Sequence, residues 1–361
     1  MLKVRILVNA AVVTGEPCGI MRYLQNLVPR QASLCDLAVL TSCPSAFAGA
    51  GCQTVPIPLW TRDAYTRFVW ELTCLRHYCT SDYDVLFNPT PLGVPCAPLP
   101  VISCVHDLTP LTVPRLHSPL YKATFWADLQ SLRWADAVVV DSERTARDLS
   151  SLRLVPGRRV SVVPLGPAVQ PCGETASLGR ELEPYVLYVG GHWAHKNVKR
   201  LLAAFSKLRS PDGLRLVLVG GGPMSENTTA IVRLGLGDRT LLLRDLTDAD
   251  LSSLYSHCSA FVCPSLYEGF GLPVLEALAH GAPVACSDSS SLPEIAEQAA
   301  LYFSPHSVSE IAKQIQALLD DTGLSAKLRS MGPARAARFS WERTAQDIHE
   351  IALRLVGQPD D

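Results

Sequence analysis

The stretch Ala260-Phe-Val-Cys-Pro-Ser-Leu-Tyr-Glu-Gly-Phe-Gly-Leu-Pro-Val-Leu-Glu276 decides the fold class of this chain. It opens with four apolar residues typical of a buried strand, and then passes through the turn Glu268-Gly-Phe-Gly271 into residues with helical spacing. Pro273 suits the first turn of a helix, and Gly281 suits the position just after its end. A strand, a glycine-rich turn and a helix in succession indicate a βα unit, whose free turn amides and helix dipole favour an anion.

Two carboxylates bracket this turn. Glu268 lies on the turn itself, and Glu276 lies about one helical turn inside the helix. Carboxylates suit sugar hydroxyls and the turn suits a diphosphate, so the pattern favours a ligand that is part sugar and part diphosphate. The ordinary alternative is a helix-capping Glu followed by a solvated helix Glu, and two isolated carboxylates would favour that interpretation.

The composition predicts a folded soluble protein of two domains. The chain has 361 residues, of which 48% are hydrophobic and 18% are charged. A net charge of −2 argues against a nucleic-acid surface. The twelve cysteines form no Cys-x-x-Cys pair, which excludes a zinc ribbon and indicates a reducing cytoplasm. The apolar N-terminus is interrupted by Asn9, so we expect a first buried strand there and not a signal peptide.

Apolar runs alternate with segments of helical periodicity along nearly the whole chain. Two successive series of βα repeats predict an α/β protein with two doubly wound parallel sheets. The first series of expected strands comprises residues 4–8, 36–41, 85–88, 101–105, 137–141 and 160–164. The second comprises residues 185–189, 214–219, 241–244, 260–263 and 283–286, with helices expected at 198–209, 248–257 and 308–319.

A Pro/Gly-rich stretch at 164–175 separates the two series and predicts the domain boundary. We therefore expect a first domain over residues 1–170 and a second over residues 171–339. A second breaker, Met331-Gly-Pro333, precedes a final helix expected from about residue 340 to 355. Ligands of such sheets bind beyond the carboxyl ends of the strands, so we expect the site in the cleft between the domains.

The segment from Pro264 to Val284, followed by Leu292-Pro-Glu-Ile295, resembles the E-x7-E signature of retaining family 4 glycosyltransferases with the GT-B fold. The resemblance covers most of the chain and is strongest over residues 185–303. It implies two Rossmann-like domains that face each other across a cleft, the first on the acceptor side and the second binding the nucleotide sugar. It also implies that the terminal helix, within residues 340–361, crosses back onto the first domain.

The family's roles carry over onto the matching residues. The resemblance implies that Glu268 meets hydroxyls of the donor sugar and that Glu276 binds the ribose of the nucleotide. The turn between them would hold the diphosphate. The residues of this part of the expected donor site are Gly269, Phe270, Gly271 and Leu272.

Lys196 matches the family's phosphate-binding lysine. It follows the expected first strand of the second domain and stands at a helix start, where it can neutralise a departing diphosphate. The family often has an Arg shortly before this Lys, where this chain has Gly191, which we include in the donor site. The second positive charge is therefore unassigned, although His192 or His195 could substitute. Two histidines without a third ligand favour hydrogen bonding over metal binding, so we expect no metal site.

The segment Cys104-Val-His-Asp-Leu-Thr-Pro110 ends a strand and resembles the family's V-H-D-L segment. The resemblance implies that His106 approaches the donor sugar near the reacting carbon, as a catalytic residue together with Glu268 and Lys196. A His there could hydrogen-bond a sugar hydroxyl or a developing charge, and Asp107 could set its tautomer. The alternative is a strand-end His satisfied locally. We expect mainly structural roles for Asp141-Ser142.

The segment from Gly15 to Tyr23 resembles the family's G-I-G-R-Y turn, with Met21 in place of the second Gly. Gly19 would let the backbone approach the diphosphate or the sugar. Arg22 is a further candidate, although a position on an ordinary helix face explains it equally well.

Two weaker candidates follow the third strand of the second series. Arg244 and Leu246 occupy the place where the family's backbone meets the base of the nucleotide. Simple turn chemistry would explain them as well.

The resemblance thus implies a retaining, metal-independent hexosyltransferase without a cofactor. It would use a nucleotide diphosphate sugar and a hydroxyl of a glycan or lipid-linked acceptor. The His-Asp-Leu and His-Lys-Asn variants are similar to the mannosyltransferase-like branch that builds surface polysaccharides, which favours GDP-mannose over UDP-glucose and dTDP-rhamnose. A phosphorylase or epimerase on the same fold and a non-catalytic nucleotide-sugar-binding relative are the alternatives. Acceptor, linkage and oligomeric state stay open.

One apolar stripe bears on location. It lies at helical spacing beside three arginines and could dock on an anionic membrane near a lipid-linked acceptor, although such a stripe is more often core. We expect a cytoplasmic protein, with a peripheral position at the inner face of the membrane as the alternative. The stripe comprises Tyr65, Phe68, Val69, Leu72 and Leu75, and the arginines are Arg62, Arg67 and Arg76.

Overall fold

The computed structural model describes residues 3–15, 19–116, 118–171, 176–209 and 213–357. The chain divides into two compact units, and each is described by itself. The first unit contains Met1–Pro110, His117–Ala168 and Ser340–Asp361, and the second contains Leu111–Leu116 and Val169–Phe339.

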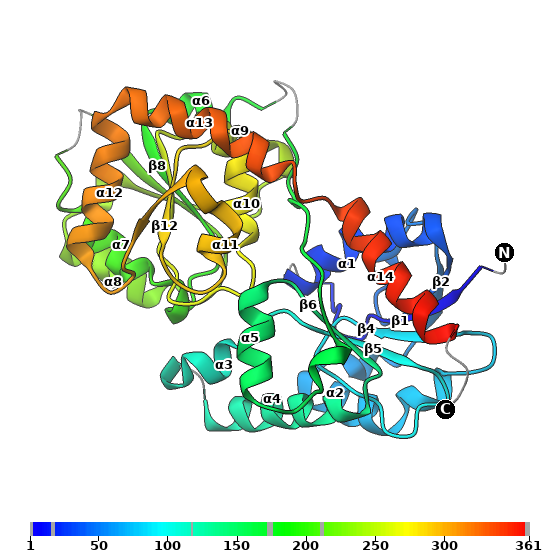
Figure 1. Cartoon of the computed structure of the whole chain (residues 1–361). Coiled ribbons are helices and arrows are strands. Elements are labelled where there is room, and N and C mark those ends of the chain that lie inside the picture. Colours follow the sequence, from blue (N-terminus) through cyan, green and yellow to red (C-terminus); the bar gives the residue numbers. More distant parts are fainter. Residues whose placement is uncertain (1–2, 16–18, 117, 172–175, 210–212, 358–361) are drawn as a thin grey trace. The chain divides into compact units, whose positions relative to one another are not determined.

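The first unit is built on a seven-stranded parallel sheet with the strand order β3-β2-β1-β4-β5-β6-β7 (Figure 1). Its central strands are buried along nearly their whole length, as expected where helices cover both faces of a sheet. The direction of winding reverses between β1 and β4, so a topological switch point lies between these two strands. The strands are β1 (Arg5–Asn9), β2 (Asp36–Thr41), β3 (Gln53–Pro56), β4 (Val85–Asn88), β5 (Val101–Val105), β6 (Ala137–Val140) and β7 (Val160–Val162).

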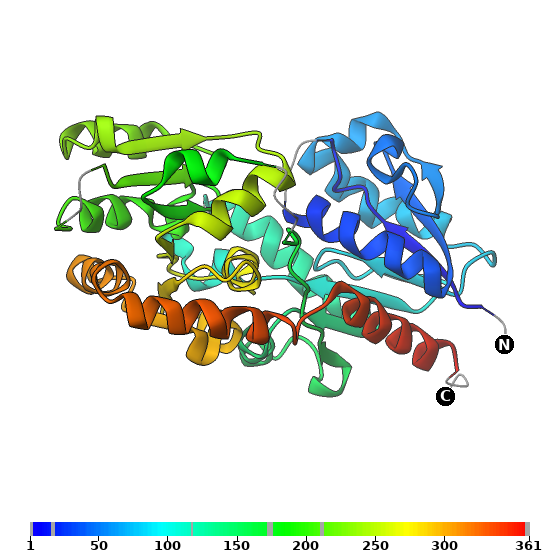
Figure 2. The same ribbon diagram turned by 90° about the horizontal axis from the view of Figure 1, so that it is seen from above.

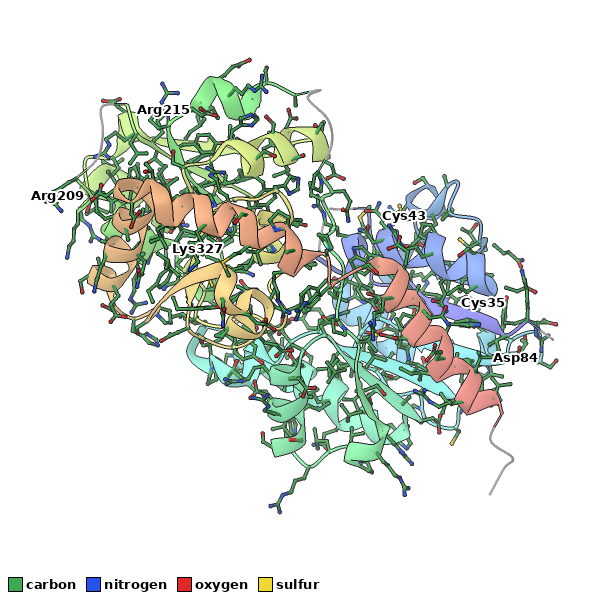
Figure 3. The ribbon with its side chains drawn as sticks, turned by 45° about the horizontal axis from the view of Figure 1, so that its top comes forward. Cys35, Cys43, Asp84, Arg209, Arg215 and Lys327 are labelled. Carbon is green, nitrogen blue, oxygen red and sulfur yellow. The ribbon has the colours of Figure 1, made fainter. Side chains whose placement is uncertain are left out.

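At the amino ends of these strands, Asp84 fixes the register of β1 against β4 (Figure 3). Its carboxylate accepts the backbone N–H of Arg5 at 2.8 Å and the Arg5 guanidinium at 2.6 Å. The carboxyl ends at the opposite edge carry the polar side chains considered below.

The helices of the first unit include the last helix of the chain. Helix α14 packs against α1, and the two lie side by side in Figures 1 and 2. The indole N–H of Trp341 donates to the carbonyl of Pro167 at 3.1 Å, and Ser340 caps the helix through the N–H of Arg343. The helices are α1 (Gly19–Leu34), α2 (Ala64–Thr73), α4 (Pro119–Ser131), α5 (Glu143–Ser151) and α14 (Trp341–Val356). The short helix α3 (Thr109–Thr112) is divided, with Thr109 and Pro110 assigned to the first unit and Leu111 and Thr112 to the second.

The second unit repeats the pattern with a six-stranded parallel sheet, ordered β10-β9-β8-β11-β12-β13. Its core includes Tyr188, Phe205 and Phe303, all fully buried. Its strands are β8 (Tyr185–Val189), β9 (Arg215–Val219), β10 (Thr240–Leu243), β11 (Ala260–Cys263), β12 (Val284–Ser287) and β13 (Ala300–Phe303). Its helices are α6 (Leu178–Leu182), α7 (Val198–Phe205), α8 (Ser225–Arg233), α9 (Asp248–His257), α10 (Leu272–Ala279), α11 (Leu292–Ala296), α12 (Val308–Asp320) and α13 (Thr322–Ala336).

The predicted fold class is confirmed, because both series of strands form parallel sheets. Each expected strand begins and ends within two residues of an observed one, but β3 and β13 were not expected. Strand β3 is a short edge strand with exposed ends, so it lacks the apolar run of a central strand. Strand β13 follows a helix and a 3-10 turn that are themselves apolar, which hides its start in the sequence.

The prediction that Met331-Gly-Pro333 interrupts the helical structure was wrong, because these residues lie inside α13. Gly332 is needed there for packing, since a Cβ on it would lie 2.8 Å from the carbonyl oxygen of Leu278 in α10. Pro333 follows three residues before the helix ends. The glycine thus marks a close approach of two helices and not a chain break.

Within the described residues, none of the helices combines the length and the apolar character that crossing a lipid bilayer requires.

Candidate functional site

The glycine-rich turn between β11 and α10 has the conformation that its sequence predicts. Gly271 is the N-cap of α10 with φ of 104°, a conformation that favours glycine, and a Cβ there would lie 2.6 Å from Cδ2 of Leu292. Pro273 stands in the first helical turn, and Gly281 follows the helix with φ of 66°. The turn therefore cannot carry a side chain at Gly271 without rearrangement.

Glu268 and Lys196 form an ion pair in the second unit. The Nζ atom of Lys196 donates to both carboxylate oxygens of Glu268 at 2.8 Å, and Ser265 donates to Oε1 at 2.6 Å. Burial raises the pKa of Glu268. Lys196, Ser265 and the nearby His195 lower that pKa by more than burial raises it, so the net pKa lies below its ordinary value. Glu268 is therefore a buried, ionised carboxylate in direct contact with the candidate phosphate lysine.

Asn197 holds this lysine in place. It adopts a left-handed conformation with φ of 62° between the 3-10 helix η7 (Ala194–Lys196) and α7. Its side-chain amide donates to the carbonyls of Pro264 and Pro305, both at 2.8 Å. The loops after β8, β11 and β13 are thus tied together beside Lys196, which limits the movement of its ammonium group.

Glu276 is almost completely buried, with 3% of its surface exposed, so it is not a solvated helix residue. The hydroxyl of Tyr255 donates to Oε2 at 2.7 Å, and the backbone N–H of Val169 donates to Oε1 at 3.3 Å. The ring of Tyr255 stacks on His280, whose Nδ1 lies 2.7 Å from the carbonyl of Glu276.

His192 lies in the loop after β8, beside Gly191, and its N–H donates to the carbonyl of Gly221 at 2.8 Å. Its Nδ1 lies 3.0 Å from the side-chain amide of Asn227. Burial and then the charge of Arg244 lower the pKa of His192, so it is neutral at pH 7. A Cβ on Gly191 would lie 2.8 Å from the indole of Trp193, which shows that this glycine makes room for a neighbouring side chain.

The loop after β10 carries Arg244 and Leu246 at the same carboxyl edge of the sheet, because the N–H of Gly220 donates to the carbonyl of Leu243. Arg244 is exposed and contacts the sulfur of Met224 through its guanidinium. Leu246 is partly buried.

The first unit holds His106 at the carboxyl end of β5. Its Nδ1 lies 2.8 Å from Oδ2 of Asp141, and its Nε2 lies 3.0 Å from the carbonyl oxygen of Pro89. Asp107 instead accepts the backbone N–H of Thr109 at 2.8 Å and so begins α3. The expectation that Asp107 sets the tautomer of His106 was therefore wrong, whereas the mainly structural role expected of Asp141 stays a prediction.

Tyr23 is the residue of the first βα turn that reaches His106. Its ring meets the imidazole edge-on with the ring centres 4.7 Å apart, and its hydroxyl lies 3.7 Å from Sγ of Cys104. Gly19 is the first residue of α1 and has open space around it, and Arg22 is partly buried on the same helix. Residues 16–18 of the predicted turn lie outside the described residues.

Four of these contacts involve residues that the sequence did not single out. Ser265 and Asn197 lie within quoted motifs, so their polar side chains were a usable signal. Tyr255 lies on α9, and only the fold brings it to Glu276. Pro89 acts through its backbone carbonyl, for which side-chain chemistry gives no signal.

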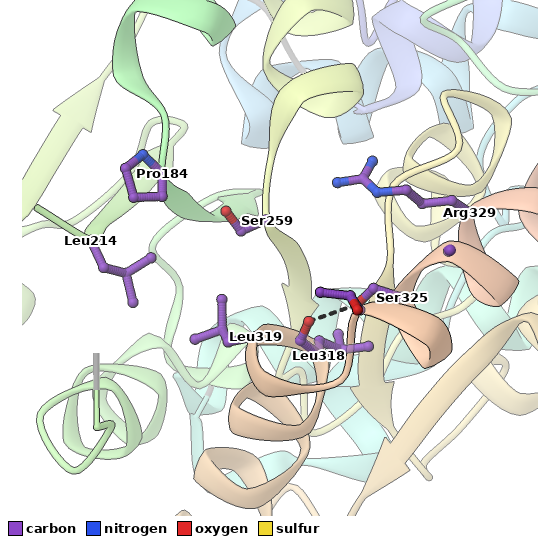
Figure 4. Close-up of a pocket in the computed structure, with 9 residues that line it drawn as sticks. Pro184, Leu214, Ser259, Leu318, Leu319, Ser325 and Arg329 are labelled. Carbon is purple, nitrogen blue, oxygen red and sulfur yellow. Dashed lines mark hydrogen bonds between the residues drawn. The ribbon is translucent and has the colours of Figure 1, made fainter. Parts of the chain in front are cut away.

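A pocket of about 330 Å³ opens at the amino ends of the strands of the second sheet, where residues just before β8, β9 and β11 line it (Figure 4). Arg329 lines it but donates to the carbonyls of Cys258 at 2.6 Å and Gly281 at 3.1 Å. Ser325 donates to the carbonyl of Leu318 at 2.6 Å. Arg329 and Ser325 thus bond to carbonyl groups of the chain itself.

In the part of the chain that is described, no group of three His, Cys, Asp or Glu side chains could hold a metal ion.

Two family models match the chain. Residues 17–168 match the model described as glycosyltransferase family 4, and residues 175–335 match the model described as glycosyl transferases group 1. Between them they cover most of the sequence, with the junction close to the start of the second unit.

Several curated proteins are similar in sequence. O-antigen chain mannosyltransferase B of Escherichia coli is 37% identical over 47% of this chain and 46% of its own length. The serotype-specific mannosyltransferase WbdA of Escherichia coli is 31% identical over 72% of this chain and 34% of its own length. The chain therefore spans half or less of these two relatives. The MMP alpha-(1->4)-mannosyltransferase of Mycolicibacterium hassiacum is 29% identical over 76% of this chain and 72% of its own length.

Solved structures with the GT-B fold superpose on nearly the whole chain. Sucrose-phosphate synthase from Thermosynechococcus elongatus matches with a TM-score of 0.80 at 21% identity, covering 98% of this chain and 99% of its own. HepE of Anabaena, solved in complex with UDP and glucose, matches with a TM-score of 0.78 at 17% identity, covering 98% and 100%. At these identities the likeness shows the fold alone.

Proposed function

The chain belongs to glycosyltransferase family 4, and from this premise we propose that it transfers a hexose, with mannose favoured, from a nucleotide diphosphate sugar to a hydroxyl of a glycan or lipid-linked acceptor with retention of configuration. The observation that carries the proposal is the partly buried pair of Lys196 and Glu268 beside the glycine-rich turn. The pair places a cation for a diphosphate next to a carboxylate for sugar hydroxyls.

The leaving diphosphate would be held in the second unit. Lys196 and the backbone amides of the turn from Gly269 to Gly271 supply positive potential where the negative charge develops. His195 is the better candidate for the unassigned second cation, because it lies near enough to Glu268 to lower the pKa of that carboxyl, whereas burial and Arg244 lower the pKa of His192. In the transfer step the bond from the anomeric carbon to the phosphate oxygen breaks, the bond to the acceptor oxygen forms, and the acceptor proton goes to a phosphate oxygen.

The ribose of the nucleotide would bind Glu276. A buried carboxylate whose two oxygens accept hydrogen bonds from Tyr255 and from the N–H of Val169 is held in a fixed orientation toward ribose hydroxyls. Ionised Glu268 would accept sugar hydroxyls in the same way. Lys196 would then be shared between Glu268 and the diphosphate.

Mannose is favoured as the transferred sugar because three similar proteins are named mannosyltransferases. GDP-mannose is accordingly our first choice of donor. UDP-glucose is the second, since a protein of the same fold was solved with UDP and glucose.

We further infer that an exposed apolar patch, formed by Leu59, Trp60, Tyr65 and Val69, meets an anionic membrane that carries the acceptor. These residues lie on the 3-10 helix η2 (Leu59–Arg62) and on α2, and each is more than half exposed. The exposed Arg62 lies on η2, and the exposed Arg76 lies beyond α2 on the 3-10 helix η3 (Leu75–Tyr78). Leu75, the last residue of the predicted stripe, is buried in the core, so only part of the stripe is available.

Binding and transfer can be tested in sequence. Thermal shifts should be measured with GDP, UDP, dTDP and ADP, each with and without EDTA, and the preferred donor should then be assayed for diphosphate release with mannosylated acceptors. A selective shift that survives EDTA, followed by acceptor-dependent release, is the expected result. Glu268→Gln should reduce that release, whereas Glu226→Gln on the exposed surface of α8 should leave it unchanged. Binding of none of the four nucleotides would refute a catalytic role.

A further inference from the structure

His106 is held by two hydrogen-bond acceptors. Its Nε2 lies 3.0 Å from the carbonyl oxygen of Pro89, and its Nδ1 lies 2.8 Å from a carboxylate oxygen of Asp141. A carbonyl oxygen can only accept, so Nε2 must carry a proton to bond with it. An ionised carboxylate sets the same requirement at Nδ1.

A singly protonated ring does not fit these contacts. If the only proton were on Nδ1, the lone pair of Nε2 would face the lone pairs of the Pro89 carbonyl at 3.0 Å. If the only proton were on Nε2, the lone pair of Nδ1 would face an ionised Asp141. Both arrangements put like partial charges in contact in a largely buried site, where such contacts are costly.

We propose that Asp141 is a positioning residue that keeps His106 doubly protonated, so that the imidazole carries a positive charge, donates one N–H to Asp141 and the other to the Pro89 carbonyl, and does not serve as a base. The proposal rests on the proposed function only for the catalytic role of His106. The protonation of the ring itself does not depend on that function.

The charged surroundings of His106 support this state. Burial lowers the pKa of His106, but the charge and hydrogen bond of Asp141, followed by the charge of Asp107, raise it, and the net pKa lies above its ordinary value. Burial also raises the pKa of Asp141, and His106 lowers it only in part. The shared proton lies on the ring as long as Asp141 is ionised, and protonation of both ring nitrogens is what distinguishes this state from a proton held on Asp141.

Two other titratable neighbours remain neutral. Cys104 approaches from β5 and Tyr23 from α1, and burial raises the pKa of both. Asp107 lies on the same loop as His106, but its carboxylate is bonded to the N–H of Thr109. Asp141 is therefore the residue in direct contact that can retain the second proton.

The test is an NMR titration of the imidazole nitrogens in the free protein, with His106 assigned by the signals lost in His106→Gln. In the wild type we expect both nitrogens to stay protonated above pH 6.5, the value for an unperturbed His. In Asp141→Asn the proton affinity of His106 should fall at least about tenfold, because the charge partner is gone. Asp107→Asn is the matched control, and its fall should be smaller.

A wild-type midpoint at or below 6.5, or an unchanged midpoint in Asp141→Asn, would overturn the proposal. If Asp141→Asn does not fold, the wild-type titration alone decides. Where transfer can be assayed, the loss of kcat/KM at high pH should move to lower pH in Asp141→Asn, which a merely structural role would not cause. A protein without transferase activity would refute the proposed function and leave the titration result standing.

Discussion

The hydroxyl of Tyr255 donates to Oε2 of Glu276 at 2.7 Å in the interior of the second unit. Together with the N–H of Val169, it fixes the carboxylate that we assign to the ribose of the donor. A charge-assisted hydrogen bond of this kind contributes about 1.5–3 kcal/mol, and its loss frees the carboxylate to rotate.

Tyr255→Phe should therefore weaken nucleoside diphosphate binding about tenfold, while removing no atom that we expect to touch the ligand. Isothermal titration calorimetry with the preferred nucleotide measures the effect. Tyr302→Phe is the matched control, because that hydroxyl donates to the backbone carbonyl of Glu297 in the same unit. Equal affinities for wild type and Tyr255→Phe would show that the tyrosine does not orient Glu276 for binding.

Ionised Glu268 should make the protein sensitive to acid. Its pKa in the folded state lies below the ordinary value of 4.5, so its contribution to stability is present above pH 4.5 and is lost as the pH falls through the folded-state pKa. Glu268→Gln should destabilise the protein at pH 7, because it leaves the ammonium of Lys196 without its charge partner.

That difference should narrow below pH 4.5, where wild-type Glu268 also loses its charge. Urea unfolding of both proteins between pH 7 and pH 3.5 gives the comparison. A constant difference across this range would mean that the pair with Lys196 does not determine the ionisation of Glu268.

The sequence predicted the two sheets and the carboxyl-edge residues because both depend on local pattern. Buried parallel strands are apolar runs, and Gly271 with Pro273 marks a specific turn and helix start. The partners of the site residues depend on tertiary contacts and could not be predicted in this way. Asp141 lies 35 residues beyond His106 and reaches it only because β5 and β6 pair in the sheet, whereas adjacency in sequence favoured Asp107.

Replacing Gly271 should destabilise the protein more than replacing a glycine elsewhere that also has a positive φ. Gly271→Ala meets both an unfavourable φ of 104° and the side chain of Leu292 at 2.6 Å. Gly235→Ala has φ of 66° but open space around it, so it isolates the backbone effect. We expect about 1 kcal/mol for Gly235→Ala and about 2–4 kcal/mol for Gly271→Ala in urea unfolding. Similar values for the two variants would show that Leu292 moves aside without cost.

The exposed apolar patch predicts binding to anionic lipid vesicles. Replacement of Trp60 and Tyr65 together by Ser should reduce co-sedimentation with vesicles that contain phosphatidylserine, because the buried apolar area is lost. Val232→Ser, at a residue that is 74% exposed on α8 of the second unit, provides a control. The inferred membrane contact would be contradicted if the wild type bound phosphatidylserine-containing and neutral phosphatidylcholine vesicles equally. It would also be contradicted if the double variant bound the phosphatidylserine-containing vesicles as well as the wild type does.

Two carboxylates in the first unit should make the protein less stable as the pH rises, which is opposite to the effect of Glu268. Asp128 on α4 and Glu71 on α2 are near enough to repel, and Asn9 donates to Oε1 of Glu71 at 3.0 Å. Burial and then the charge of Glu71 raise the pKa of Asp128 to about 7, although Arg67 lowers it in part. The folded protein therefore holds a proton on Asp128 between pH 4 and 7 that the unfolded chain releases, so stability falls as the pH rises through this range.

Asp128→Asn removes this titration and keeps the shape of the side chain. Relative to the wild type, we expect the variant to gain about 1–3 kcal/mol of stability between pH 5 and pH 8, because each unit of pKa shift is worth about 1.4 kcal/mol. Urea unfolding at the two pH values measures the difference. Asp36→Asn, at an exposed ion pair with Lys3, should keep the wild-type slope. A wild-type stability that does not fall between pH 5 and pH 8 would show that Asp128 is ionised in the folded protein despite its burial beside Glu71.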